Sequence, residues 1–414
     1  MTPQRDEPAA AGPTRDVVWT GYASFFVLGL IVLLVPSLIR QVEAAFGVDD
    51  AAMGAAYLLN SVVWVVGTIS AGMLVSRMDR HLLLGAGPAS VVIGLLLMTL
   101  GGTWPAFLVG FMAMGFGAGV IDSGTNALFM DLFHGRQAGA LNRLHLWVSV
   151  GAMTGPLAVG RLVGAGVPWQ AVALGVAAVT APVGIAFATR RLPAGHVARA
   201  EGTEAAPGAA AAEAGRRGPR VPLPIIVLAV AIACYVAMEA GVTGWLVRYL
   251  DAAALEVATL ALALFWGGMA LARLLSSFVV DRIGAVRFAA TGAVACGCAV
   301  IASLAAPSVA VAVLCFALAG FAAGPIYPMI MAIAGSRYPD RTSTVASVLA
   351  SAGIVGSIVY PPLLGAISST VGLRAGIAGA GVMAFVAAGA IVLGAGMATR
   401  AGHVTPTAVR ASQD

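Results

Sequence analysis

Residues 17–40 read VVWTGYASFFVLGLIVLLVPSLIR, and their only charged side chain is Arg40 at the end. A helix needs about 20 mostly apolar residues to cross the hydrocarbon core of a bilayer, and this stretch is long enough. It is also longer than the apolar region of a secretory signal peptide. We therefore predict a transmembrane helix here, preceded by a polar cytoplasmic tail at residues 1–16.

The rest of the chain repeats this pattern. Hydrophobic residues make up 60% of the sequence and charged residues only 10%, whereas soluble domains are nearer one quarter charged. Similar apolar stretches recur at 52–76, 82–101, 104–129, 141–166, 168–190, 222–249, 255–280, 287–306, 308–334, 342–371 and 373–398. The sequence thus predicts an all-α integral membrane protein with twelve transmembrane helices.

Composition divides the chain into two bundles and fixes their orientation. Residues 191–221, rich in Ala, Gly, Arg and Glu, predict a cytoplasmic linker between six-helix bundles at 17–190 and 222–398, with a cytoplasmic tail at 399–414. All 23 basic residues are Arg. If the N-terminus is cytoplasmic, eighteen of them lie in cytoplasmic segments and four outside. The positive-inside rule then places both termini and the linker in the cytoplasm.

The two bundles are an internal repeat. A shift of 205 residues, without a gap, brings Arg136 onto Arg341, Pro156 onto Pro361, and six glycines of the first bundle onto glycines of the second. Because six helices is an even number, both bundles cross the membrane in the same sense. The sequence therefore predicts a parallel repeat, related by an axis along the membrane normal.

Two loops resemble a motif of the major facilitator superfamily of secondary transporters. These are GMLVSRMDR at 72–80 and SFVVDRIGAVR at 277–287, which resemble its Gly-x-x-x-Asp-Arg-x-Gly loop. Ser76 replaces the Asp of the motif and Ser277 its first Gly. The resemblance covers about residues 17–398 and implies transport by alternating access.

In that superfamily the loop makes a tight turn and holds an Arg against helix ends, where it latches neighbouring helices. The matching residues here are Arg77 in the first copy and Asp281 with Arg282 in the second. We assign these three to gating. The alternative is that they are simple positive-inside anchors.

Within the superfamily, several stretches resemble the fucose permease and related sugar–proton symporters. They are GFGAGVIDSGTNALF at 115–129, LNRLHLWVSVGAMTGP at 141–156, YVAMEAGVTGW at 235–245 and FWGGMALARLL at 265–275. That group carries a carboxylate in its first helix, whereas FFVLGLIVLLVP at 25–36 has none. Any coupling carboxylate must therefore lie elsewhere in this chain.

Asp122 is the first candidate, because it lies well inside the predicted fourth helix. A charge in mid-membrane costs several kcal/mol and marks a functional site by default. Gly115, Gly119, Asp122 and Asn126 share one helix face, and the glycines let a neighbouring helix approach closely. We predict a proton site at Asp122, with Asn126 binding solute; the alternative is a structural hydrogen bond between helices.

Glu239 is the second buried acid, on the seventh predicted helix, with Tyr235 one turn before it on the same face. The resemblance implies that the first, fourth, seventh and tenth helices line the cavity, so Asp122 and Glu239 would face it from opposite bundles. The repeat shift places Tyr327 on Asp122. We predict coupling at Glu239 and solute binding at Tyr235 and Tyr327, although Glu239 could equally be a paired structural acid.

Arg273 lies inside the eighth predicted helix on a stripe with Trp266. A lone buried Arg needs a partner, so we expect an ion pair with Asp122 or Glu239 that acts as a gate. Snorkelling to the cytoplasmic interface is the alternative. We predict solute binding at Trp266.

His145 forms a polar stripe with Asn142 and Ser149 on the fifth predicted helix, and a His inside a membrane can bind a ligand or relay protons. We predict solute binding at His145. Its alternative role is a helix-end His hydrogen-bonded to backbone.

The sequence contains no nucleophile elbow, Walker loop, metal-binding spacing or basic, aromatic nucleic-acid stripe. We expect no enzyme activity, cofactor, metal or nucleic-acid partner. The first hypothesis is a proton-coupled symporter for a small polar, sugar-like solute in the cytoplasmic membrane, with protons and lipid as its other partners. The alternatives are a proton-driven exporter of a drug or metabolite, an uncoupled facilitator in which the buried acids serve binding alone, and a non-transporting membrane sensor. The resemblance also implies a monomer.

Overall fold

The computed structural model describes residues 15–75, 78–133, 136–190, 192, 221–338 and 341–402. Arg77 and most of the predicted N-tail, linker and C-tail lie outside these residues. Twelve spans in the described chain are long and apolar enough to cross a membrane, which confirms the predicted number. Each overlaps one of the predicted stretches.

The first bundle, or N-half, consists of six long helices. They are α1 (Arg15–Phe46), α2 (Asp50–Leu74), α3 (Arg80–Leu100), α4 (Trp104–Leu132), α5 (Gln137–Gly164) and α6 (Trp169–Thr189). Side chains cap two of them: Asp49 accepts a hydrogen bond from the Ala52 N–H, and Thr103 accepts one from the Ala106 N–H. These caps satisfy backbone donors that a helix start leaves unpaired.

The second bundle, or C-half, contains one broken span. Its helices are α8 (Leu223–Tyr249), α9 (Leu255–Ile283), α10 (Ala285–Leu304), α11 (Val309–Ala323), α12 (Ile326–Arg337), α13 (Thr342–Val371) and α14 (Leu373–Gly402). Together α11 and α12 form the tenth span, which breaks at Pro325 because proline has no N–H for the helical ladder. The predicted span at 308–334 is therefore present, but it consists of two helices.

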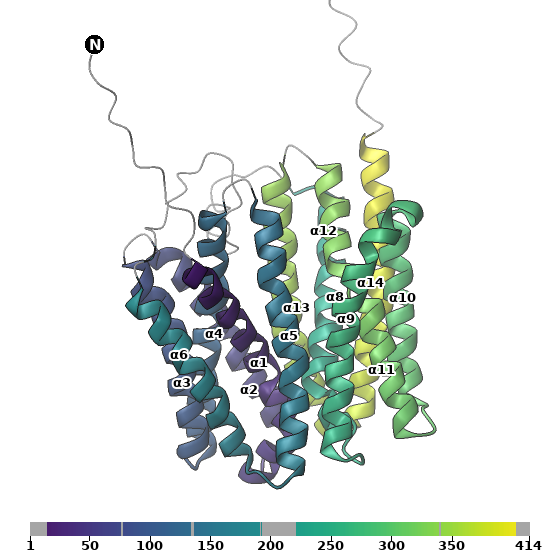
Figure 1. Ribbon diagram of the computed structural model, residues 1–414. Coiled ribbons are helices and arrows are strands. Elements are labelled where there is room, and N and C mark those ends of the chain that lie inside the picture. The colour runs from purple at the N-terminus through teal and green to yellow at the C-terminus, as the bar shows by residue number, and fades with distance from the viewer. Residues whose placement is uncertain are drawn as a thin grey trace, which may run out of the picture.

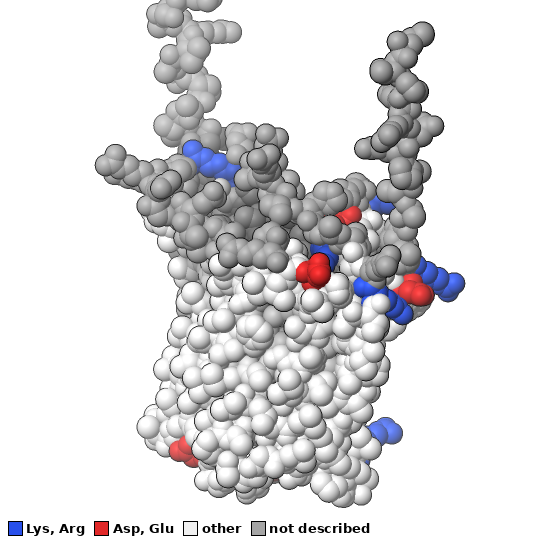
Figure 2. Space-filling model, turned by 90° about the vertical axis from the view of Figure 1, so that its left-hand side faces the viewer, with Lys and Arg blue, Asp and Glu red and all other residues white. Residues whose placement is uncertain are grey.

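The two bundles stand side by side, the N-half in purple to blue and the C-half in green to yellow (Figure 1). We call the end at which α1 begins and α14 ends the inner end, and the opposite end the outer end. Charged side chains gather towards the two ends, and a broad uncharged band separates them (Figure 2). This band is what a bilayer-spanning protein presents to lipid.

Helix packing repeats at the predicted offset of 205 residues. A Cβ added to Gly115 or Gly119 of α4 would collide with α2, at Asn60 and Trp64 respectively. In the C-half, Gly320 and Gly324 meet α9 in the same way, at Phe265 and Met269. Each of these residues lies 205 positions after its N-half counterpart. Close helix contact at small residues is therefore built twice into the chain.

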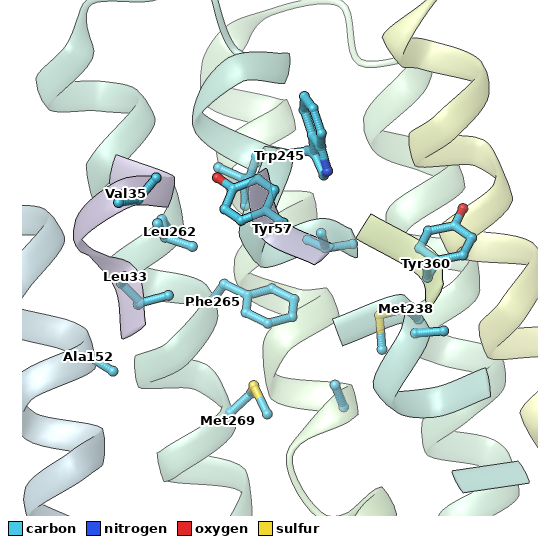
Figure 3. Close-up of a cluster of buried hydrophobic side chains, with 14 of the residues drawn as sticks. Leu33, Val35, Tyr57, Ala152, Met238, Trp245, Leu262, Phe265, Met269 and Tyr360 are labelled. Atoms are coloured by element: carbon cyan, nitrogen blue, oxygen red, sulfur yellow. The ribbon is translucent and has the colours of Figure 1, made fainter. Parts of the chain in front are cut away.

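The halves meet through two equivalent helix pairs, α2 with α13 and α5 with α9. Gly54 of α2 lies against Gly365 of α13, and Gly160 of α5 lies against Thr259 of α9. The second pair follows from the first by the same offset. Between them, Tyr57 of α2 packs edge-on to Trp245 of α8, with ring centroids 5.8 Å apart (Figure 3). The Gly54–Gly365 and Gly160–Thr259 contacts lie toward the outer end of their helices.

Candidate functional site

A central cavity of about 640 Å³ lies between the halves and is walled by α1, α2, α4, α8 and α13. Cavities of roughly 300–1,000 Å³ are the size that small-molecule sites have. Its wall is mostly apolar and contains one carboxylate, that of Asp122. The lining residues include Ile31, Leu33, Tyr57, Asn60, Ser61, Trp64, Thr68, Phe111, Met114, Asp122, Thr243, Ser351, Ile354, Ser357 and Pro361.

Asp122 and Asn126 form a polar pair on α4. The Asn126 amide donates to the Asp122 carboxylate oxygen at 2.9 Å and to the Asp122 backbone carbonyl at 3.0 Å. Within the described residues the carboxylate has no ion-pair partner. An acid in mid-membrane without a counter-charge marks a candidate functional site.

Most other polar groups of the cavity wall already have backbone partners. Five of them donate to main-chain carbonyls: Tyr57 to Gly244, Asn60 to Phe111, Thr68 to Gly119, Thr243 to Glu239 and Ser357 to Ile354. Ser61 and Ser351 make no hydrogen bond with any other described residue. Asp122 and these two hydroxyls are therefore the groups most available to a solute, together with the Asn60 amide oxygen.

Glu239 and Tyr235 lie on α8 outside the wall of this cavity. Tyr235 is 2% exposed, and its buried hydroxyl has no hydrogen-bond partner among the described residues. The Glu239 carboxylate is partly buried one turn further on and makes no ion pair there. Tyr327 of α12 packs against Tyr235, with ring centroids 6.4 Å apart. Tyr235 and Tyr327 are thus in contact within the C-half, and Glu239 lies one turn from Tyr235 on α8.

His145 and Trp266 also lie outside the cavity wall. His145 of α5 is exposed and packs edge-on against Phe25 of α1, at 5.2 Å between centroids. Trp266 of α9 is partly buried, and its indole N–H is a second buried donor without a partner in the described chain. Of the seven coupling and binding residues expected from sequence, the structure places only Asp122 on the wall.

Arg273 does not form the expected ion pair in this conformation. Its Nε donates to the Gly324 carbonyl at 2.9 Å, and no described carboxylate lies within ion-pair distance. The Gly324 carbonyl would normally accept from the N–H four residues on, but that residue is Pro328, which has none. Arg273 therefore satisfies a carbonyl that the broken span leaves free.

The N-half contains the same contact in a weaker form. The Thr68 hydroxyl of α2 donates to the Gly119 carbonyl of α4 at 3.4 Å. Thr68 and Gly119 are the counterparts of Arg273 and Gly324 at the offset of 205. This equivalence assigns Arg273 a structural contact that both halves share.

At the inner end, an intra-half ion pair joins α3 to α4. Arg80 is 4% exposed, and its Nη1 lies 2.6 Å from Asp131 Oδ2. Asp281 and Arg282, which were expected to take part in gating, are exposed at the end of α9 and make no ion pair with a described residue. The sequence singled out the neighbouring loop but missed Arg80 and Asp131.

A larger group of charges at the outer end joins the two halves. We call Arg40, Glu43, Asp50, Arg248 and Asp251 the outer cluster. Arg248 Nε lies 2.8 Å from Glu43 Oε2 and 3.1 Å from Asp50 Oδ1, and Arg248 Nη1 lies 3.2 Å from Asp251. Arg40 lies 3.3 Å from Asp251 and donates to the carbonyls of Val247, Leu250 and Ala253.

Sequence reasoning missed the outer cluster because it counted Arg40 and Arg248 only as outside charges. Acids within a few residues of an outside Arg, at the ends of the first and seventh helices, were the available signal. Every hydrogen bond and ion pair that joins the halves within the described chain lies toward this end. The structure is therefore closed at the outer end.

The comparisons with known proteins agree with a two-half bundle around a central cavity. The sequence pattern of the Major Facilitator Superfamily matches residues 20–257 and 244–411. This chain belongs to the Major Facilitator Superfamily. It is therefore a membrane-spanning secondary transporter and not an enzyme.

Individual members of the superfamily are only distantly similar. The sodium-dependent glucose transporter 1A of Mus musculus is 25% identical over 136 residues, which are 33% of this chain and 32% of that protein. The chain thus spans about a third of the length of this relative. A mutant peptide transporter in complex with sulfate is 15% identical, with a TM-score of 0.75 over 96% of this chain and 99% of that one. A mutant of the E. coli fucose:proton symporter is 16% identical, with a TM-score of 0.60 over 91% of this chain and 98% of that one. The two structures establish the fold alone.

Proposed function

We propose that this superfamily member is a proton-coupled symporter for a small polar solute, in which Asp122 carries the exchangeable proton. The single observation behind this proposal is the position of Asp122. It is the only carboxylate on the described cavity wall, and it has no counter-charge there. A carboxyl that changes charge in the cavity alters the free-energy cost of closing that cavity off from water, which is what coupling requires.

The transport cycle follows from the closed outer end. A neutral, protonated Asp122 lets the halves close around an occupied cavity, because no unpaired charge is then buried between them. Loss of the proton at the inner end restores a charge that favours a hydrated, open cavity. Asn126 orients the carboxylate through its 2.9 Å hydrogen bond, so that solute and proton meet the same face of α4.

The remaining predicted residues enter the proposal in secondary roles. Glu239, with Tyr235 and Tyr327, is proposed as a second polar subsite in the C-half. The free indole N–H of Trp266 and the exposed His145 are proposed to meet the solute when the halves reorient. Arg273, Arg77, Asp281 and Arg282 are proposed to act at the inner end in the opposite conformation, where α4, α5, α9 and α12 would approach one another.

A sugar-like solute is supported by the stretches that resemble the fucose permease and by the glucose transporter relative. That relative is named as sodium-dependent, so sodium is the competing coupling ion. Proton coupling is preferred because Asp122 is a single carboxylate in a mostly apolar wall, and burial of such an acid favours proton binding. We also propose the cytoplasmic membrane, cytoplasmic termini and a monomeric state, from the Arg distribution and the family resemblance.

Proton-driven export of an amphipathic solute is the second candidate, and the cavity wall favours it. Ile31, Leu33, Trp64, Phe111 and Met114 present large apolar surfaces, whereas few polar groups there lack partners. A sugar needs many hydrogen-bond partners, but an amphipathic amine needs chiefly apolar contact and one carboxylate. In that case the proton and the amine would compete for Asp122.

Proteoliposomes separate these candidates. The protein would be offered hexoses, pentoses and small polyols for symport and ethidium for export, under an imposed proton gradient or an imposed sodium gradient. Sugar accumulation along the proton gradient supports symport, and ethidium movement against it supports export. Movement driven by sodium alone would refute the proton assignment. Asp79→Asn, an exposed acid whose side chain caps no helix, is the control for Asp122→Asn.

A further inference from the structure

The outer cluster contains one negative charge too many. Glu43, Asp50 and Asp251 provide three carboxylates, whereas Arg40 and Arg248 provide two guanidinium groups. Asp251 has a side chain that is 59% exposed, so water solvates its charge. The side chains of Glu43 and Asp50 are only 11% exposed each, so the excess charge falls on this buried pair.

The pair shares a single nitrogen atom. Arg248 Nε lies 2.8 Å from Glu43 Oε2 and 3.1 Å from Asp50 Oδ1. The other carboxylate oxygen of Asp50 accepts a hydrogen bond from the Ser368 hydroxyl of α13. The second oxygen of Glu43, Oε1, is buried and has no partner in the described chain. One carboxylate of the pair is therefore fully satisfied, and the other has a free acceptor.

No second cation among the described residues compensates this arrangement. Arg40, also on α1, uses its N–H groups on Asp251 and on the carbonyls of α8 and the turn that follows it. From α2, Tyr57 faces the pair and donates to the Gly244 carbonyl, and Asp49 caps its own helix. Glu256 of α9 lies instead against Gly164 of α5. Tyr249 of α8 and Arg374 of α14 donate to the carbonyls of Ser303 and Leu304, so neither compensates the pair.

Two buried carboxylates that share one guanidinium nitrogen repel each other, and a proton on one of them removes that repulsion. We propose that Glu43 and Asp50 form a proton-binding site at the outer gate, and that closing this gate takes up one proton. The proton occupies the free Glu43 Oε1 and leaves Oε2 in contact with Arg248. The site is separate from Asp122 and does not depend on the proposed coupling role of that residue.

The sign of the pH effect follows by linkage. Opening the gate hydrates both acids, so the open form holds the proton less tightly than the closed form. Stability of the closed gate is therefore present at acid pH and is lost as the pH rises through the proton affinity of the closed pair. The proton enters and leaves on the same side. It therefore tunes the gate and is not itself transported.

The test measures how far the cavity is open to the outer end. Ser61→Cys places a thiol on the cavity wall, and Ala252→Cys places one on the exposed outer surface. Each variant, in cells, is treated with a membrane-impermeant maleimide between pH 6 and 8.5, and the labelling of the parent is subtracted. The ratio of Ser61→Cys to Ala252→Cys labelling removes the intrinsic pH dependence of thiols. Labelling of Ala252→Cys from outside also verifies the orientation.

We expect this ratio to rise with pH, by up to about tenfold per unit while one proton is released. Glu43→Gln and Asp50→Asn, each added to Ser61→Cys, should keep the ratio low and flat, because an amide has no proton to release. Glu256→Gln, the same change at the same end outside the outer cluster, should retain the parental response. A ratio that rises on acidification, a parental response in both amide variants, or a response to sodium at fixed pH would overturn the proposal.

Discussion

The charged side chains of the outer cluster are ion-paired, whereas those near the middle of the bundle are not. At the outer end, all five side chains of the outer cluster form ion pairs, and three of the four pairs cross from one half to the other. Near the middle, Asp122, Glu239 and Arg273 form no ion pair with a described residue. The acids Glu43, Asp50, Asp122 and Glu239 are all at least partly buried, so burial alone does not explain the difference.

The difference indicates a division of labour. Ion pairs across the interface between the halves stabilise the closed conformation, because opening the outer end must separate the paired charges and hydrate each one. An unpaired acid facing a cavity does not stabilise one conformation over another through an ion pair, but it can exchange a proton or contact a solute. We therefore assign the conformation to the outer cluster and the coupling to Asp122.

Removing Arg248 should open the outer end. Arg248→Ala leaves Glu43 and Asp50 buried together without their shared cation, which costs about 3–5 kcal/mol in the closed form. The Ser61→Cys labelling ratio should then be high at every pH. Arg161→Ala, an exposed Arg at the same end, is the control and should leave the ratio unchanged. A low, parental ratio in Arg248→Ala would show that apolar contacts alone close this end.

Close helix packing should matter equally in both halves. A Cβ at Gly119 would collide with the Trp64 carbonyl, and a Cβ at Gly324 with that of Met269. Gly119→Ala and Gly324→Ala should each lower stability by about 1–3 kcal/mol, read as the thermal unfolding midpoint in detergent. Gly175→Ala, where a Cβ meets nothing within 4 Å, is the matched control and should not lower it. Unequal losses would break the equivalence of the two halves.

Arg273 should behave as a structural donor. Arg273→Ala leaves the Gly324 carbonyl without a donor and should cost about 1–3 kcal/mol, more than Thr68→Val at its N-half counterpart. Pro328→Ala restores a backbone N–H four residues beyond Gly324, so the double variant should recover part of the thermal stability. If the double variant recovers no thermal stability and Arg273→Ala has lost transport, the result would support only the proposed gating role of Arg273.

Glu239 should have the smallest effect. It lies outside the described cavity wall, so Glu239→Gln should change proton-driven transport by less than about tenfold, equivalent to 1.4 kcal/mol. Initial rates in proteoliposomes measure this. An effect as large as that of Asp122→Asn would move the coupling site, or part of it, into the C-half.

The sequence predicted the fold well because lipid imposes strong local rules. The twelve apolar stretches predicted the spans, and the offset of 205 predicted the repeat. The break at Pro325 was missed, although Pro325 and Pro328 stand three residues apart in the printed sequence. The two prolines leave backbone carbonyls without helical donors, and Arg273 of α9 donates to one of these, the Gly324 carbonyl. A contact from another helix is not visible in the local sequence pattern.

The candidate site was harder to predict. Asp122 and Asn126 were found because their spacing on one helix face is readable. The outer cluster was missed because its partners come from α1, α2 and α8, and only packing brings them together. The offset of 205 residues also does not relate α1 to α8, the two helices that contribute most of the outer cluster. Gly151 meets the carbonyl of Phe26 and Gly356 that of Ala233, so the offset between α1 and α8 is 207 rather than 205.

The most direct test of the central claim compares net transport with exchange in Asp122→Asn. A solute identified in the proteoliposome screen would be measured twice, as accumulation driven by a pH gradient and as counterflow without one. If Asp122 carries the exchangeable proton, the variant loses accumulation, retains counterflow, and shows no solute-dependent proton movement, while Asp79→Asn resembles the parent. Accumulation at the parental level in Asp122→Asn would contradict the account, and coupling would then lie elsewhere in the bundle.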